Sequence, residues 1–207
     1  MTTKLVTFSP TPEGGTFSMG ADLAGLVEAL ELEKPAVIGH SMGGMSAAEA
    51  VGLKPELFCC AILEDPPWRD SMPQQIAGVG APADRNKLTV EEIAAAGKLQ
   101  SPTWHEDEFP AWAESKLQLR VPEDWRARRA SGLGQWRETA NAIGVPTLLV
   151  RGGNAARGRI VDDAVAAEAQ QLNSRIECVC LAKAGHNIRR EAFREFVAAV
   201  NAFLARH

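Results

Sequence analysis

Ser41 stands in a sequence that could make its hydroxyl a nucleophile. The apolar run 36–39 leads into the motif GHSMGG, and the small residues that follow favour a helix. A Gly-x-Ser-x-Gly motif between a strand and a helix predicts a very sharp turn. We therefore expect Gly39 and Gly43 to let the backbone pass closely and Ser41 to project at the carboxyl end of a strand. The N–H of Met42, at the start of the helix, would then face an oxyanion formed on a substrate.

A serine hydroxyl needs a base, and His186 has the most suitable position among the four histidines. It follows the apolar run 176–181 and the dipeptide Ala-Gly, on a loop that leads into an amphipathic C-terminal segment. An imidazole suits the role because its pKa near neutrality lets it take the serine proton and return it to a leaving group. The alternative interpretation is a histidine on an exposed loop. His40 is expected to pack beside the nucleophile, whereas His105 lies in a tryptophan-rich region and His207 ends the chain.

The motif GHSMGG after a strand-like run, with Ala-Gly-His far behind it, resembles the α/β-hydrolase superfamily of serine hydrolases and esterases. Nearly all of the chain can be aligned with that superfamily. The resemblance implies that Ser41 is the nucleophile and that His186 is the base. It also implies a carboxylesterase-type reaction through an acyl-enzyme, and an acid that comes between these two residues in chain order.

The acid is where the sequence departs from the family pattern. The resemblance places it just after the strand that ends at Val150, but the matching residue here is Asn154. An amide can hydrogen-bond an imidazole but carries no charge to stabilise imidazolium. Dehalogenase-like relatives place the acid at the end of the next strand, the one that follows the helix after the nucleophile. In this sequence that position favours Glu64, with Asp65 as the alternative acid. A turn with both carboxylates facing solvent is the other interpretation.

Length and composition exclude several classes of protein. A chain of 207 residues can bury one core, and its net charge of -4 argues against a nucleic-acid partner. No apolar run approaches bilayer length and no signal peptide is recognisable, so we expect a cytoplasmic protein without a membrane partner. No cluster of His, Cys and carboxylates has ligand spacing, so we expect no metal and no cofactor. The four cysteines fall in strand-like runs, which predicts buried, reduced thiols.

Strand-like and helical segments alternate along the chain, which predicts an α/β fold. Together with the resemblance, this gives a reduced α/β-hydrolase-like parallel sheet of about five strands, flanked by helices. Residues 1–67 and 137–207 would form the core, and residues 68–136 a helical cap. The expected strands are 4–9, 36–39, 57–63, 145–150 and 176–181.

All five tryptophans lie in the predicted cap. Large aromatic side chains there could line an apolar pocket for a small or medium acyl group, or they could simply hold a small helical insertion together. The residues expected to bind a small-molecule ester substrate are His40, Trp68, Trp104, Phe109 and Trp112.

The resemblance also implies a missing part. Full-length relatives have about three strands and a helix ahead of the region that begins here, including the loop that supplies a second oxyanion N–H. Loss of one such donor costs about 2.7–4 kcal/mol of transition-state stabilisation, which predicts weak or promiscuous esterase activity. The expected strand 4–9 would leave an exposed sheet edge, which predicts either a homodimer through that edge or a rearranged N-terminus in which residues 1–17 cover the site.

Two other functions remain open at this point. The first is a catalytically degenerate hydrolase-like protein that binds a ligand without turnover, which the asparagine at position 154 and the missing oxyanion loop favour. The second is an acyl-transfer or lyase enzyme on the same scaffold, using His186 without an acyl-enzyme.

Overall fold

The computed structural model describes residues 18–70, 88–118 and 135–207, and its centre is a parallel sheet. The four strands of that sheet lie in the order β1-β2-β3-β4 and all neighbours are parallel, as the alternation of strands and helices predicts. The predicted strand 4–9 lies outside the described residues, so a fifth strand stays a prediction. The strands are β1 Val37–His40, β2 Ala61–Glu64, β3 Thr147–Gly152 and β4 Ile176–Leu181.

The second strand is shorter than the sequence predicts. The apolar run 57–63 suggests one continuous strand, but a 3-10 turn, Pro55–Leu57, occupies its start. Strand β2 begins only at Ala61, and all of its residues are buried. A strand buried on both faces is expected in the middle of a parallel sheet covered by helices.

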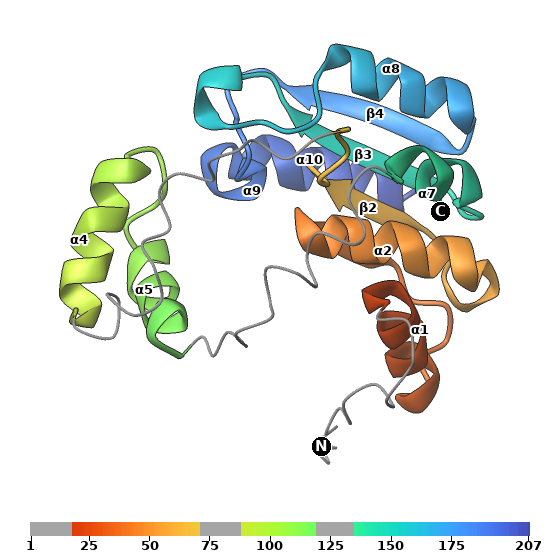
Figure 1. Cartoon of the computed structure of the whole chain (residues 1–207), viewed down its shortest axis with the longest axis horizontal. Helices are drawn as coiled ribbons and strands as arrows, with labels where there is room; N and C mark the ends of the chain where they lie inside the picture. The colour runs from red at the N-terminus through yellow and green to blue at the C-terminus, as the bar shows by residue number, and fades with distance from the viewer. Residues whose placement is uncertain (1–17, 71–87, 119–134) are drawn as a thin grey trace.

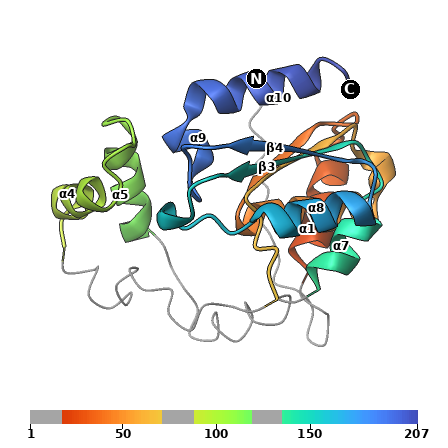
Figure 2. The ribbon, with the colours of Figure 1, turned by 90° about the horizontal axis from the view of Figure 1, so that it is seen from above.

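Helices cover both faces of the sheet (Figures 1 and 2). Among the described residues, four helices lie on one face, over a core that contains Leu63 and Leu149, and two lie on the other, over a core that contains Ile62 and Val150. Adjacent strand residues alternate between the two cores because successive side chains point to opposite sides of a strand. The first face carries α1 Met19–Ala29, α2 Met42–Leu53, α7 Trp136–Ala142 and α8 Asp163–Leu172, and the second carries α9 Ile188–Glu191 and α10 Phe193–Leu204.

Several helices begin where the sequence provides a capping side chain. The Ser18 hydroxyl accepts from the N–H of Ala21 at 3.1 Å at the start of α1, and the Asp162 carboxylate accepts from the N–H of Val165 at 2.9 Å at the start of α8. These contacts satisfy donors that the first turn of a helix leaves without partners.

Two further helices, α4 Val90–Gln100 and α5 Glu108–Gln118, lie beyond the carboxyl ends of the strands (Figures 1 and 2). They pack against each other closely, since a Cβ on Gly97 of α4 would lie 2.5 Å from the ring of Trp112 of α5. The pair touches the rest of the protein at α9, where Arg190 Nε donates to Glu108 Oε2 at 2.8 Å. These helices fall within the segment 68–136 that the sequence assigns to a cap.

The two residues that bound the predicted cap lie in the core of the first face. Trp68 and Trp136 are both buried, and their rings stack with centroids 5.7 Å apart. The described core therefore includes the tryptophans at both boundaries. The assignment of the intervening helices to a separate cap stays a proposal.

Strand β1 forms one edge of the described sheet, and its Ile38 side chain is 52% exposed. The predicted homodimer through an exposed edge stays a prediction. None of the helices in the described ranges is long and apolar enough to cross a bilayer. The four cysteines all lie in these ranges and are free thiols. Of these four, Cys60 is buried, Cys59 and Cys178 are half-buried and Cys180 on β4 is exposed, so the expectation that all four are buried holds for Cys60 alone.

Candidate active site

Ser41 occupies a strained turn between β1 and α2. Its backbone angles are φ 54° and ψ -120°, a region that L-residues rarely adopt. Its N–H donates to the Glu64 carbonyl at 2.9 Å, and its carbonyl accepts from the N–H of Met45 at 3.1 Å, the first turn of α2. The chain therefore reverses at Ser41 with its side chain half-exposed at the carboxyl end of β1. This is the geometry that the motif predicts.

Glycine is required at Gly39 for steric reasons. A Cβ there would lie 2.1 Å from the Gly43 carbonyl oxygen, so the strand could not pass under the start of α2. A Cβ on Gly43 would meet nothing within 4 Å, whereas a Cβ on Gly44 would lie 3.1 Å from the Gly39 carbonyl. The expectation that Gly43 is needed for close passage is therefore wrong, and the close approach is made by Gly39 and Gly44.

Met42 begins α2, so its N–H lies at the positive end of the helix. The first four N–H groups of a helix have no acceptor within the helix itself. The Met42 N–H, next to the Ser41 side chain, is thus placed to donate to an oxyanion formed at that hydroxyl.

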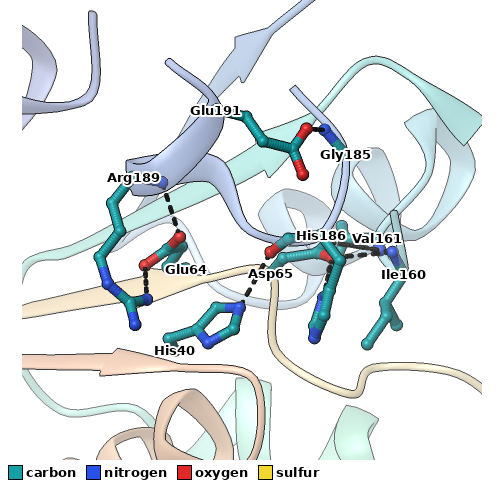
Figure 3. A network of polar contacts seen from close by, with 9 residues as sticks. All are labelled: His40, Glu64, Asp65, Ile160, Val161, Gly185, His186, Arg189 and Glu191. Carbon is teal, nitrogen blue, oxygen red and sulfur yellow. Dashed lines mark hydrogen bonds and ion pairs between the residues drawn. The ribbon is translucent and has the colours of Figure 1, made fainter. Parts of the chain in front are cut away.

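His186 pairs with Asp65. His186 Nδ1 lies 2.7 Å from Asp65 Oδ2, and the Asp65 side chain is 0% exposed (Figure 3). The other hydrogen bonds to this carboxylate come from the backbone N–H groups of Ile160, at 2.9 Å, and Val161, also at 2.9 Å. The carboxylate is thereby fixed in one orientation, and it holds the proton of the imidazole on Nδ1. This leaves His186 Nε2 as the atom that can accept a proton.

Glu64, the preferred acid from sequence, has a different partner. Its Oε1 accepts from the backbone N–H of Arg189 at 2.9 Å, and its Oε2 accepts from Arg189 Nη1 at 2.7 Å. The structure therefore brings Asp65, the alternative acid, to the imidazole and directs Glu64 to α9 (Figure 3). Neither carboxylate faces solvent, because both side chains are buried.

Asn154 is a local cap and no partner of the imidazole. Within the described part of the chain, its Oδ1 accepts from the N–H of Ala156 at 3.0 Å, at the start of the 3-10 turn Ala155–Arg157. Its backbone N–H donates to the Ala184 carbonyl at 2.9 Å. Asn154, at the family's usual acid position, thus shapes the loop after β3, and the loop that carries His186 packs against this loop.

That packing requires Gly185. A Cβ on Gly185 would lie 2.2 Å from Arg157 Cβ and 2.3 Å from the Arg157 carbonyl oxygen. The His186 N–H donates to the same carbonyl at 3.1 Å, and the Gly185 N–H donates to Glu191 Oε2 at 2.7 Å. The Ala-Gly-His sequence therefore fits one narrow path between two loops, which fixes where the imidazole begins.

The turn at Ser41 and the loop that carries His186 meet at His40. Its Nε2 lies 2.9 Å from the His186 carbonyl oxygen, and the two rings have centroids 4.6 Å apart. In the sheet, His40 of β1 is in register with Glu64 of β2. Ser41 and Asp65 are the next residues of these neighbouring strands, so both lie at the sheet edge that His186 covers. Sequence reasoning placed His40 beside Ser41, but missed that it holds the loop that carries His186.

Burial lowers the pKa of His40 below its ordinary value of 6.5, and the nearby charges of His186 and Arg189 lower it further, while Glu64 opposes them. The neutral ring can donate its Nε2 proton to the His186 carbonyl. Because the folded protein resists protonation, the unfolded chain binds the proton first as pH falls. The contribution of His40 to the free energy of unfolding is therefore fully present above pH 6.5, and it is lost as the pH falls toward the pKa of His40 in the folded protein.

We predict that His40→Gln removes part of this acid sensitivity. The parent should lose up to about 1.4 kcal/mol of unfolding free energy per pH unit below 6.5 through this group, and the variant should not. Urea unfolding of both proteins at pH 7.5 and 5.5 measures the difference, in which all other titrating groups are shared. An identical pH dependence in the two proteins would contradict the assignment.

The aromatic residues expected to bind substrate are found in two places. Trp68 lies in the core under the sheet, while Trp104, Phe109 and Trp112 cluster between α4 and α5. The Arg190 guanidinium lies over the Trp104 ring, 4.5 Å from its centroid. Arg190 and Trp104 thus join the aromatic cluster to α9, the helix that follows His186. In the described ranges, no group of three His, Cys, Asp or Glu residues could hold a metal ion.

Comparison with known proteins identifies the family and the fold. The sequence profile of the alpha/beta hydrolase family matches residues 7–199. No curated protein sequence is significantly similar to the chain. Among solved structures, the chain is similar to an N-formylmaleamic acid deformylase from Pseudomonas putida S16, with a TM-score of 0.66 and 22% identity over 88% of this chain and 73% of that chain.

Two other solved structures have the same fold. The E-2-(acetamidomethylene)succinate hydrolase has a TM-score of 0.66 and 19% identity, over 95% of this chain and 76% of that chain. The thioesterase domain from the curacin biosynthetic pathway has a TM-score of 0.65 and 16% identity, over 90% of this chain and 74% of that chain. At these identities the likeness concerns the fold, while the profile match covers most of the sequence. The chain belongs to the alpha/beta hydrolase family.

Proposed function

We propose that this protein is a serine hydrolase of the carboxylesterase type, with Ser41 as nucleophile, His186 as base and Asp65 as acid. The observation that carries the proposal is the 2.7 Å contact between His186 Nδ1 and the fully buried Asp65 carboxylate. A surface histidine would have no need of such a partner. The strained backbone of Ser41, at the same sheet edge, supports the proposal independently, since strain of this kind is concentrated at functional sites.

The reaction follows from the roles of these groups. Ser41 Oγ attacks the carbonyl carbon of an ester while His186 Nε2 takes its proton. The Asp65 carboxylate stabilises the imidazolium, and the Met42 N–H donates to the oxyanion of the tetrahedral intermediate. Collapse of this intermediate returns the proton to the leaving alcohol and leaves an acyl-enzyme on Ser41. Water then repeats the sequence and releases the acid.

We further propose that α4 and α5 act as a cap and favour small or medium apolar acyl groups. The helices lie beyond the carboxyl ends of the strands, where ligands of open parallel sheets bind (Figure 1). Their inner aromatic cluster, Trp104, Phe109 and Trp112, offers apolar surface. The structurally similar deformylase and thioesterase domain are named for cleavage of acyl bonds, which agrees with this reaction class.

Fluorophosphonate labelling tests the proposal. We expect the probe to modify the parent protein at Ser41, as mapped by mass spectrometry of peptides, and to leave Ser41→Ala unmodified. The same preparation should hydrolyse p-nitrophenyl acetate and butyrate faster than p-nitrophenyl palmitate. Absence of both labelling and hydrolysis would identify a non-catalytic binding protein. Activity that survives Ser41→Ala but not His186→Ala would identify a lyase or transferase without an acyl-enzyme.

A further inference from the structure

Glu64 is a buried carboxylate that the proposed reaction does not use. Its side chain is 1% exposed, yet it carries two hydrogen bonds from one residue, the backbone N–H and the Nη1 of Arg189. The Arg189 side chain is 38% exposed, so the charge of the pair opens to solvent on the arginine side only.

The Glu64–Arg189 pair lies beside the contact between Asp65 and His186. Glu64 directly precedes Asp65 at the end of β2, and Arg189 lies in the short helix α9 that follows His186. Two adjacent carboxylates of one strand end therefore hold the same loop at two points, one through the imidazole and one through the first turn of α9. The Asp65 contact holds the imidazole itself. The Glu64 contacts hold the residues that follow it and add to the contacts of the His186 backbone with His40 and Arg157.

Stability alone is a poor reason for burying this carboxylate. Removing a carboxylate from water costs several kcal/mol, and a buried ion pair can often be replaced by apolar residues without loss of stability. Geometry is a better reason, because a base must be held within about 0.5 Å of its productive position. A misplacement of about 1 Å can cost on the order of 100-fold in rate.

We propose that Glu64 and Arg189 are positioning residues that help to hold His186 at the sheet edge that carries Ser41, by clamping the start of α9 to the end of β2. The inference rests on the proposed hydrolase function for its kinetic part only. Its structural part, the fixed hydrogen bond between His186 and Asp65, can be measured whether or not the protein turns over an ester.

Substitutions of Glu64 separate the two hydrogen bonds. Glu64→Gln keeps an acceptor for the backbone N–H of Arg189 and removes the charge, so kcat should fall less than about 5-fold. Glu64→Ala removes both contacts, and kcat should fall about 30–100-fold with KM changed less than about 3-fold. Arg189→Met keeps the backbone contact and should give an intermediate loss, which serves if Glu64→Ala does not fold.

The spectroscopic readout is the low-field proton resonance of His186 Nδ1–H, assigned by its loss in His186→Asn. It should persist in Glu64→Gln and broaden or vanish in Glu64→Ala as the hydrogen bond to Asp65 loosens. A matched control is Glu177→Ala, because Glu177 on β4 also pairs with an arginine, Arg206, at 2.7 Å, but in an exposed position. This control should leave both the resonance and kcat unchanged.

Two results would overturn the inference. Unchanged kcat and an unchanged resonance in folded Glu64→Ala would show that the pair only adds stability. A resonance that changes equally in Glu177→Ala would show a general loosening of the fold. If the parent has no Ser41-dependent activity, the proposed function fails, and the resonance alone decides the positioning role.

Discussion

Replacing Ser41 by glycine is expected to abolish ester hydrolysis and to stabilise the fold at the same time. Ser41 has φ 54° and ψ -120°, where an L-residue brings its Cβ close to the backbone, at a cost of about 1–2 kcal/mol. Glycine has no Cβ and adopts this conformation freely, although its greater freedom in the unfolded chain offsets part of the gain. We expect a net gain of about 1 kcal/mol, or about 2–4 °C in Tm.

The loss of activity should be at least about 10⁴-fold in kcat, because the variant lacks the atom that forms the acyl-enzyme. The matched control is Ser46→Gly, one turn further along α2, where the serine hydroxyl donates to the Met42 carbonyl at 3.0 Å in ordinary helical geometry. Glycine there should lower the unfolding free energy by about 1 kcal/mol. Thermal unfolding of both variants decides the matter: a Ser41→Gly protein less stable than the parent would show that the turn is not strained.

The sharp turn at Ser41 could be predicted from the sequence because everything that makes it is local. The apolar strand, the steric need for Gly39 and the helix after Ser41 are neighbours in the chain. The position of His186 could also be predicted from the sequence, since Gly185 and His186 follow closely after the end of a strand. The role of Gly43 was misjudged, because the motif does not reveal which glycine touches the strand.

The choice of acid depended on information that is not local. Neighbouring strand residues face opposite sides of a sheet, so Glu64 shares the face of Ile62, which α9 and α10 cover. Asp65 has φ 42° and turns toward the loop that contains Ile160. The alternation predicts that one carboxylate faces each way, but not which of them meets the imidazole. That depends on how the loop after β4 crosses the sheet edge.

The aromatic residues show a second limit of sequence reasoning. Trp68 and Trp104 occur in the same tryptophan-rich segment, yet the first lies in the core and the second stacks on Phe109 beside α4. Large aromatic side chains fill cores and line pockets for the same reason, their apolar area. Composition therefore shows where large aromatic side chains gather in the sequence, but not which of them pack in the core and which lie between α4 and α5.

The sharpest test of the site compares Asp65→Asn with Asn154→Asp. Asp65 accepts hydrogen bonds from the N–H groups of Ile160 and Val161 and from His186 Nδ1. An asparagine has one acceptor oxygen, and if that oxygen serves the backbone donors, its NH₂ group faces the imidazole. Nδ1 must then accept, so the imidazole proton moves to Nε2 and the base is in the wrong tautomer.

We expect Asp65→Asn to lower kcat about 10³–10⁴-fold while the protein stays folded. Asn154→Asp restores the acid at the family's usual position, but its side chain can cap the Ala156 N–H as before, so kcat should stay within about 2-fold of the parent. Steady-state hydrolysis of p-nitrophenyl butyrate by both variants and by the double variant measures this. Recovery of activity in the double variant would show that a carboxylate at position 154 can reach the imidazole, and that Asp65 is replaceable. We expect no recovery, because the loop that carries Asn154 is fixed by its own hydrogen bond to the Ala184 carbonyl at 2.9 Å.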